Sequence, residues 1–153
     1  MSKIVIANTD EEYAAASQLF QEYAAWLGID LCFQSFDEEL LKLKEMYGLP
    51  TGAILLYKDE AFAGCVAIRN KGAQIAELKR MYLKPGFQKR GIGKALLEKA
   101  LELAKELGYK KIRLDTLASM TSAINLYKAA GFYNIEAYYF NPEPNALYFE
   151  KEF

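Results

Sequence analysis

The sequence contains no histidine, and this absence removes several kinds of catalytic site at once. Without an imidazole, neither a Ser-His-Asp nor a Cys-His mechanism can be built, and histidine-ligated metal sites are excluded. Cysteine is scarce as well, because Cys32 and Cys65 are the two in the chain and they form no C-x-x-C pair. We therefore expect no disulfide framework and no metal site, and reduced thiols in a cytoplasm are the simple interpretation.

Long apolar runs are also missing. No stretch approaches the roughly 20 residues that span a bilayer. The first residues, MSKIVIANTDEEY, lack the apolar core and cleavage site of a secretory signal, so we expect a cytoplasmic protein without a membrane partner. The formal net charge is −1 and the pI is about 5.6. Because no extended basic face accompanies that balance, nucleic acid is not an expected partner.

The 153 residues are expected to form one domain, 1–153. Apolar periodicity and turn residues predict the element order β-α-α-β-β-β-α-β-α-β-β. The predicted strands are 3–7, 53–57, 61–69, 74–83, 111–116, 132–140 and 146–150. The first predicted helix runs from Thr9 or Asp10 to about Leu27, and the second covers 38–47 with Asp37 as its cap. The third follows the glycine-containing turn at 91–93 and ends at Gly108, and the fourth runs from Ser119 or Thr121 to Ala130. This order implies an α/β fold with a mixed sheet of about seven strands flanked by helices.

The stretch Lys79–Ala104 carries the strongest functional signal. An apolar strand breaks at Pro85-Gly86, passes through Gln88-Lys89-Arg90-Gly91-Ile92-Gly93 and continues directly into an amphipathic helix. A glycine-containing turn at a helix start gathers unpaired N–H groups at the positive end of the helix dipole, which suits a phosphate or pyrophosphate. Four cations crowd this turn on a nearly neutral chain: Lys84, Lys89, Arg90 and Lys94.

Three phosphate-binding motifs share this general form. The P-loop motif fails because Ala95 follows Gly93-Lys94 where a hydroxyl residue is needed. The dinucleotide motif fails because Leu96 stands where a third glycine belongs. The spacing Gln88, Gly91, Gly93 fits Q/R-x-x-G-x-G, and here the sequence resembles the GNAT superfamily of acetyl-CoA-dependent N-acetyltransferases. The predicted element order is that of the GNAT fold, although the first 50 residues match in order and not in motif.

The resemblance implies acetyl-CoA as cosubstrate, with its pyrophosphate in the loop and its acyl arm bonded to the backbone of the preceding strand. An amide-bearing arm can pair with a strand where its neighbours separate; the alternative is simply a core strand. The residues implied in cofactor binding are Met81, Tyr82, Leu83, Gln88, Lys89, Arg90, Gly91, Ile92, Gly93, Lys94 and Ala95.

The segment Ala123–Phe132 is similar to the family signature A-I-x-L-Y-x-x-x-G-F. The resemblance implies that Tyr127 protonates the departing thiolate, although this tyrosine is equally suited to packing. Many family members carry an asparagine that bonds the cofactor arm at the position of Met120, and this loss would weaken binding by about 1 kcal/mol. Asn125 is expected to face elsewhere on the helix, so that role is not transferred to it.

Glu77 is the candidate general base, because the protein-lysine acetylating branch of the family has a glutamate at this position. A carboxylate can take the proton of the amine directly or through water. The alternative is a salt bridge to Lys79 on the same strand face. Lys79 and Arg80 are expected on opposite faces, so that one of them enters a covered side, where it would bind a substrate carboxylate or neutralise Glu77.

The acceptor amine is not named by the sequence. In this fold the region 29–39 would form part of the acceptor site, and it offers Asp30, Asp37, Glu38 and Glu39 beside Trp26, Phe33 and Phe36. These residues would attract a cationic amine, or they are a solvated helix start and core aromatics. A silent acyl-CoA-binding module is the competing hypothesis to an enzyme. A homodimer interface is possible at the tyrosines Tyr133, Tyr138, Tyr139 and Tyr148, which could equally pack internally.

Overall fold

The computed structural model describes residues 2–28 and 35–153 and has a central seven-stranded sheet in the order β1-β2-β3-β4-β5-β7-β6. The strands are β1 (Lys3–Ile6), β2 (Ala53–Lys58), β3 (Phe62–Gly72), β4 (Ile75–Leu83), β5 (Lys111–Leu117), β6 (Tyr133–Ile135) and β7 (Ala146–Glu152). The helices are α1 (Asp10–Leu27), α2 (Phe36–Leu41), α3 (Leu43–Tyr47), α4 (Ile92–Glu106) and α5 (Thr121–Ala129). Strands β4 and β5 are parallel and the other pairs are antiparallel, so the sheet is mixed as predicted.

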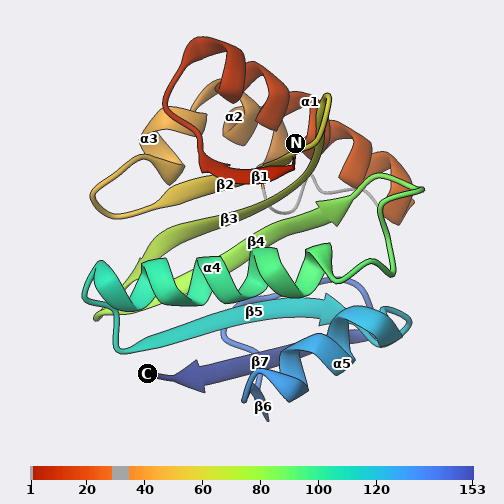
Figure 1. The fold of residues 1–153 in the computed structure, drawn as a ribbon. Helices are drawn as coiled ribbons and strands as arrows, with labels where there is room; N and C mark the ends of the chain where they lie inside the picture. Colours follow the sequence, from red (N-terminus) through yellow and green to blue (C-terminus); the bar gives the residue numbers. More distant parts are fainter. Residues whose placement is uncertain (1, 29–34) are drawn as a thin grey trace.

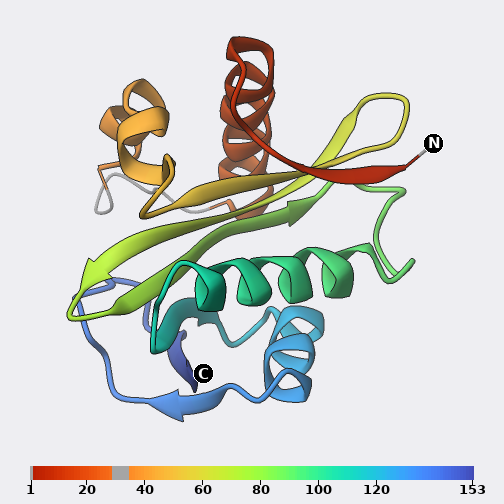
Figure 2. The same cartoon turned by 60° about the vertical axis from the view of Figure 1, so that its left-hand side comes forward.

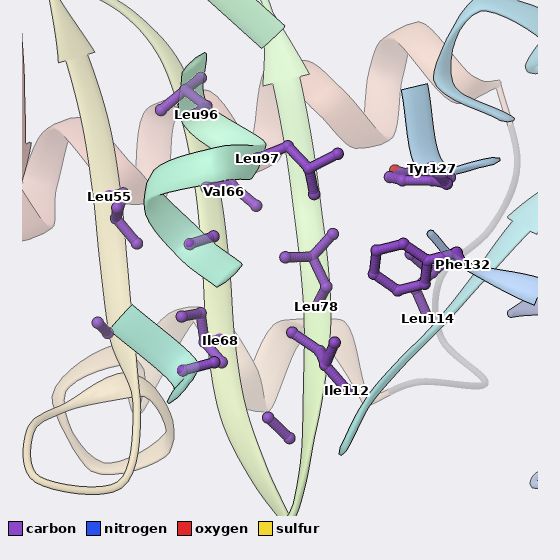
Figure 3. Packing of buried hydrophobic residues seen from close by; sticks show 14 of the residues in the cluster. Leu55, Val66, Ile68, Leu78, Leu96, Leu97, Ile112, Leu114, Tyr127 and Phe132 are labelled. Carbon is purple, nitrogen blue, oxygen red and sulfur yellow. The ribbon is translucent and has the colours of Figure 1, made fainter. Parts of the chain in front are cut away.

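The helices cover the two faces of the sheet separately (Figures 1 and 2). Helices α1, α2 and α3 lie over one face, and α4 and α5 over the other. The α4 face holds the larger core, in which Leu96 and Leu97 of α4 pack against Leu78 of β4 (Figure 3). The opposite core centres on Phe20 of α1 and Tyr47 of α3. Both faces of β2 and of the first part of β3 are therefore buried at 53–56 and 63–68, and these residues carry no polar side chain apart from the Cys65 thiol.

Two predicted elements differ from the observed ones. The predicted helix 38–47 is divided at Lys42 into α2 and α3, and Ser35 precedes α2 without a side-chain cap, so the Asp37 cap was wrong. The predicted strand 132–140 is reduced to β6, because Tyr138 and Tyr139 leave the sheet and bond to carboxylates instead. Thr9 does cap α1, in a capping box with Glu12. Within the described ranges, no helix is long and apolar enough to cross a membrane.

Strands β4 and β5 diverge after a short paired segment, and the site lies in the opening between them. They pair only at Ile75–Glu77 with Lys111–Arg113. Beyond that point β4 contains a β-bulge, because Lys79 pairs with Ala67 and Tyr82 with Cys65, leaving two residues of β4 opposite one of β3. The extra residue is Arg80, whose φ of 58° is unusual for a residue with a side chain. Figure 1 shows the two strands separating toward α5.

The bulge corrects the expectation that Lys79 and Arg80 face opposite sides. Lys79 lies within 3.9 Å of Glu77, on the face away from Leu78 and α4. Arg80 also points to that face, where its Nε and Nη2 donate to the two oxygens of Glu39 on α2 at 2.9 and 2.8 Å. Both cations are buried, with 8% and 4% of their surface exposed. The α2 side of the sheet therefore receives two adjacent positive charges.

The Arg80–Glu39 pair fastens α2 to the bulge, and its loss is a test of that role. Glu39→Ala leaves a buried guanidinium unpaired, and we expect it to lower the free energy of unfolding by about 3 kcal/mol. Glu38→Ala is the matched control, because Glu38 is the neighbouring residue on α2 and is exposed. Its effect should stay within about 0.5 kcal/mol. Equal urea-denaturation midpoints for the two variants would contradict the assigned role.

Candidate functional site

A cleft of about 620 Å³ runs between the N-terminal ends of α4 and α5. Its floor is the last part of β4, and one side is closed by Trp26 of α1. The lining residues are Trp26, Met81, Tyr82, Leu83, Gln88, Lys89, Gly91, Gly93, Lys94, Ser119, Met120, Thr121, Ser122, Ala123, Asn125 and Leu126. Cleft volumes of this order are typical of small-molecule and cofactor sites.

The loop before α4 presents an anion site at one end of this cleft. Gly91 is the N-cap of α4 with φ 80°, a left-handed conformation that a glycine adopts without strain. No side chain caps this helix, so its first N–H groups are left for water or a ligand. Gln88 braces the loop by donating from Nε2 to the Leu83 carbonyl at 3.2 Å. Lys89 and Lys94 add positive charge to the same wall.

Eight of the eleven residues predicted to bind the cofactor line the cleft: Met81, Tyr82, Leu83, Gln88, Lys89, Gly91, Gly93 and Lys94. The other three do not line it. Ile92 packs into the core on α4, and the Arg90 guanidinium lies 5.4 Å from the Phe87 ring. Ala95 donates its N–H to the Gly91 carbonyl at 3.1 Å, inside the helix. Any contact of Ile92 or Arg90 with a ligand would therefore run through the backbone.

The turn before α5 and the start of that helix contribute a wall that the sequence did not reveal. Ser119, Thr121 and Ser122 bring three hydroxyl groups to the cleft beside Met120. Asn125 also lines the cleft, which corrects the expectation that it faces elsewhere on the helix. The run Ser-Met-Thr-Ser at the start of a helix was the available signal, since hydroxyl residues gather at helix N-termini.

A second, small pocket of about 50 Å³ adjoins the cleft where β4 separates from β5. Met81, Met120 and Ala123 line both spaces, so the two are neighbours. The small pocket is also lined by Tyr23 and Leu27 of α1, by Leu78, Lys79 and Arg80 of β4, by Leu114, Asp115, Thr116 and Leu117 of β5, and by Tyr127 and Asn141.

Tyr127 enters the small pocket from α5. Its ring packs against Phe132 at 5.7 Å and Phe149 at 6.5 Å, and only 6% of the residue is exposed. Figure 3 shows its ring edge-on above that of Phe132, with the hydroxyl oxygen at the end nearer β4. Burial raises the pKa of Tyr127 above that of an ordinary phenol, so the hydroxyl remains protonated and able to donate.

Glu77 is buried on the α2 side of β4, with 1% of its surface exposed. Arg69 Nε donates to its Oε1 at 2.8 Å, and Tyr138 Oη donates to its Oε2 at 2.7 Å. Burial alone raises the pKa of Glu77, but the charge of Lys79 and the hydrogen bond from Tyr138 outweigh burial and bring it below the usual value. The ion pair with Lys79, the alternative to a base, is thus present.

Asp115 is a second carboxylate, and the sequence analysis did not single it out. It lies at the end of β5 in the small pocket, where Tyr139 Oη and Asn141 Nδ2 both donate to Oδ2. Tyr138 and Tyr139 thus bind the two carboxylates from adjacent positions, with their rings 5.3 Å apart. A signal was available, since Asp115 is a charge at the carboxyl end of a strand parallel to β4, where α/β sheets place ligands.

The tyrosines considered for a dimer interface make internal contacts. Tyr148 packs on Tyr138 and Tyr139 at 5.5 and 5.9 Å, and Tyr133 donates to Glu150. A dimer remains a hypothesis from the sequence.

A third pocket of about 440 Å³ lies under α2 and α3, and Lys79 lines both it and the small pocket. It is enclosed by Ser35, Glu38, Glu39, Lys42, Met46, Arg69, Lys71, Glu77, Lys79 and Tyr139. Burial and the charge of Arg80 lower the pKa of Lys79 to about 8. Of the acidic residues expected at an acceptor site, Asp37 and Glu38 are exposed and Glu39 is paired with Arg80. Asp30 and Phe33 lie outside the described residues.

Comparison with known proteins agrees with this geometry. An uncharacterized N-acetyltransferase of Schizosaccharomyces pombe is 39% identical over 137 residues, which cover 88% of this chain and 84% of that protein. A GNAT-family acetyltransferase structure from Staphylococcus aureus superposes with a TM-score of 0.82 at 20% identity, covering 99% of each chain.

The PaiA N-acetyltransferase of Thermoplasma acidophilum, solved in complex with coenzyme A, gives a TM-score of 0.75 at 21% identity and covers 99% of each chain. The predicted fold is confirmed, and acetyl-CoA as the acyl donor is supported. The model of the acetyltransferase (GNAT) family matches residues 10–132, and the chain belongs to that family.

Proposed function

We propose that the protein transfers the acetyl group of acetyl-CoA to a primary amine by direct attack in a ternary complex. The observation that carries this proposal is that the cleft and the small pocket are neighbours. The uncapped N-terminus of α4 lies at the cleft, and Met81, Met120 and Ala123 line both the cleft and the pocket of Tyr127. A pyrophosphate at the helix start would thus place an acyl group at the end of its arm beside a phenol.

The residues present fit the donor. The first N–H groups of α4 and the cations Lys89 and Lys94 suit the pyrophosphate. The edge of β4 at Met81–Leu83 lies at the cleft beyond its pairing with β5, so it can bond to the amides of the arm. The hydroxyl groups of Ser119, Thr121 and Ser122 and the amide of Asn125 offer further partners along the opposite wall, where Met120 offers none.

The chemistry follows from this placement. The neutral amine nitrogen attacks the thioester carbonyl, and a backbone N–H near Met81–Leu83 stabilises the oxyanion. The carbon–sulfur bond then breaks, and the Tyr127 hydroxyl donates a proton or a hydrogen bond to the departing thiolate. Because the pKa of Tyr127 is raised, full proton transfer is uphill, and stabilisation of the thiolate by a hydrogen bond is the larger contribution.

The proton leaving the amine needs an acceptor. Glu77 is the proposed base, acting through water because it lines the third pocket and not the small one. Asp115 is the alternative base, because it lines the small pocket itself. Asn141 and Tyr139 both donate to its Oδ2, so its Oδ1 is the oxygen that would accept the proton.

A catalytically silent acyl-CoA-binding module is the second hypothesis. It predicts thermal stabilisation by CoA without thiol release over a panel of amino acids, polyamines, aminoglycosides and peptides. Transfer predicts acetyl-CoA-dependent thiol release with at least one of these amines.

Gly93→Val tests the donor site. A side chain at Gly93 would contact Leu126 Cδ1 at 3.4 Å from its first atom alone, so a larger group fills the space between α4 and α5. We expect CoA affinity, measured by calorimetry, to fall about tenfold or more. Lys99→Val places the same residue at an exposed position of α4 and should leave the affinity unchanged. Unchanged binding by folded Gly93→Val protein would remove the ligand from this cleft.

Tyr127→Phe tests the thiolate partner, since it removes the hydroxyl and keeps the ring packing. We expect kcat to fall about 100-fold while the dissociation constant of CoA changes little. Tyr57→Phe is the control, because the Tyr57 ring also packs on a phenylalanine, 6.2 Å from Phe87. Equal turnover of the wild type and Tyr127→Phe would eliminate the acid role.

Glu77→Gln and Asp115→Asn together locate the base. If Glu77 takes the proton, Glu77→Gln lowers kcat/KM about 100-fold and abolishes the low-pH limb of the pH–rate profile. That limb should lie below the usual glutamate range, because the pKa of Glu77 is lowered. Tyr138→Phe, which removes one hydrogen bond to Glu77, should shift the limb to higher pH. A loss confined to Asp115→Asn would assign the proton transfer to Asp115 instead.

A further inference from the structure

The third pocket leads away from the predicted reaction point along the α2 side of β4. Lys79 lines it together with the small pocket, so the two spaces meet at this residue. Its volume of about 440 Å³ suits a small molecule and not a folded protein. An acceptor whose amine lies in the small pocket would extend its other end here.

The acidic residues of this pocket are mostly neutralised by the protein itself. Both oxygens of Glu39 accept hydrogen bonds from Arg80. Both oxygens of Glu77 likewise accept hydrogen bonds, from Arg69 and Tyr138. Only Glu38, which is exposed, adds an acidic side chain without such a partner in the part of the chain that the structure describes.

The cations of the pocket are left with capacity to bind. Lys42 and Lys71 have no carboxylate within 4.0 Å among residues 2–28 and 35–153, and both are exposed. The Lys71 ammonium is held over the rings of Tyr138 and Tyr139, at 5.7 and 5.6 Å from their centroids. Arg69 donates its Nε–H to Glu77, and 27% of the Arg69 side chain is exposed. A guanidinium offers further donors that fit a carboxylate.

We propose that this pocket binds an anionic group of the acceptor, so that the acceptor is a small primary amine carrying a carboxylate. The inference rests on the proposed acetyl transfer. Glu77 precedes Met81 by four residues, one of which is the extra residue of the bulge, so at about 3.3 Å per regular residue the level of Glu77 and Arg69 lies roughly 10 Å along β4 from Met81. The amine and the carboxylate of the acceptor are therefore separated by several bonds. A polyamine would bring a second positive charge to the same cations.

Two amines of equal length test the sign of the charge. 5-Aminopentanoate and 1,5-diaminopentane have the same chain and differ in the group at the far end. With the full chain and saturating acetyl-CoA, we expect kcat/KM for 5-aminopentanoate to be about tenfold higher or more. Lys71→Gln should raise its KM about tenfold, leave the KM of acetyl-CoA unchanged and not raise the KM of the diamine, whose far ammonium loses a repelling charge. Arg69→Gln should act in the same direction, and Lys105→Gln on the exposed end of α4 is the control.

The outcomes separate this inference from the proposed function. Turnover of the diamine at an equal or higher rate, or turnover of peptides alone, overturns the anionic acceptor and leaves acetyl transfer standing. Absence of thiol release with every amine overturns acetyl transfer. In that case, calorimetry of 5-aminopentanoate with the CoA-loaded protein still decides the pocket: binding that weakens about tenfold in Lys71→Gln supports it, and no binding overturns it.

Discussion

The pockets of this protein lie around one extra residue in the middle of β4. Strand β4 must pair with β3 along its length, yet it pairs with β5 at only three positions before the two diverge. The residue that makes the bulge is Arg80, in a left-handed conformation that costs roughly 1–2 kcal/mol for a residue with a Cβ. Two charge-assisted hydrogen bonds to Glu39, each about 1.5–3 kcal/mol, and a bond from the Cys65 thiol to the Arg80 carbonyl outweigh that strain.

The opening between β4 and β5 lies beside this bulge, and the small pocket there is lined from both faces of the sheet, by Tyr23 of α1 and by Tyr127 of α5. The α4 face supplies helix N-termini and therefore a positive end for a phosphate, while the α2 face supplies buried charged side chains. Ordinarily a continuous sheet separates such faces. Here the small pocket lies between them, and it shares Met81 with the cleft and Lys79 with the third pocket. Two substrates entering from different sides can thus meet without competing for one entrance.

What the sequence predicted correctly was local in origin. The spacing of Gln88, Gly91 and Gly93 depends on one turn, and the structure places all three at the cleft. The prediction that Lys79 and Arg80 face opposite sides of the sheet was wrong, because a bulge inserts one residue into β4. No pattern in the neighbouring residues indicates that bulge. Asp115 was missed for a related reason: its hydrogen-bond partner Tyr139 lies 24 positions later, in the segment after β6, beside the Tyr138 that donates to Glu77. The strand predicted over 132–140 is shorter than expected, because the chain leaves the sheet after β6 and places the hydroxyl groups of Tyr138 and Tyr139 on those carboxylates.

The charges around the small pocket also bear on how an amine becomes reactive there. Burial and Arg80 together lower the pKa of Lys79 to about 8. An acceptor ammonium in the same space experiences the same cations and the same loss of water, so its pKa should fall in the same direction from about 10.4. A lower pKa leaves more of the amine neutral at a given pH, and this lessens the demand on a carboxylate such as Glu77, whose oxygens are both already bonded.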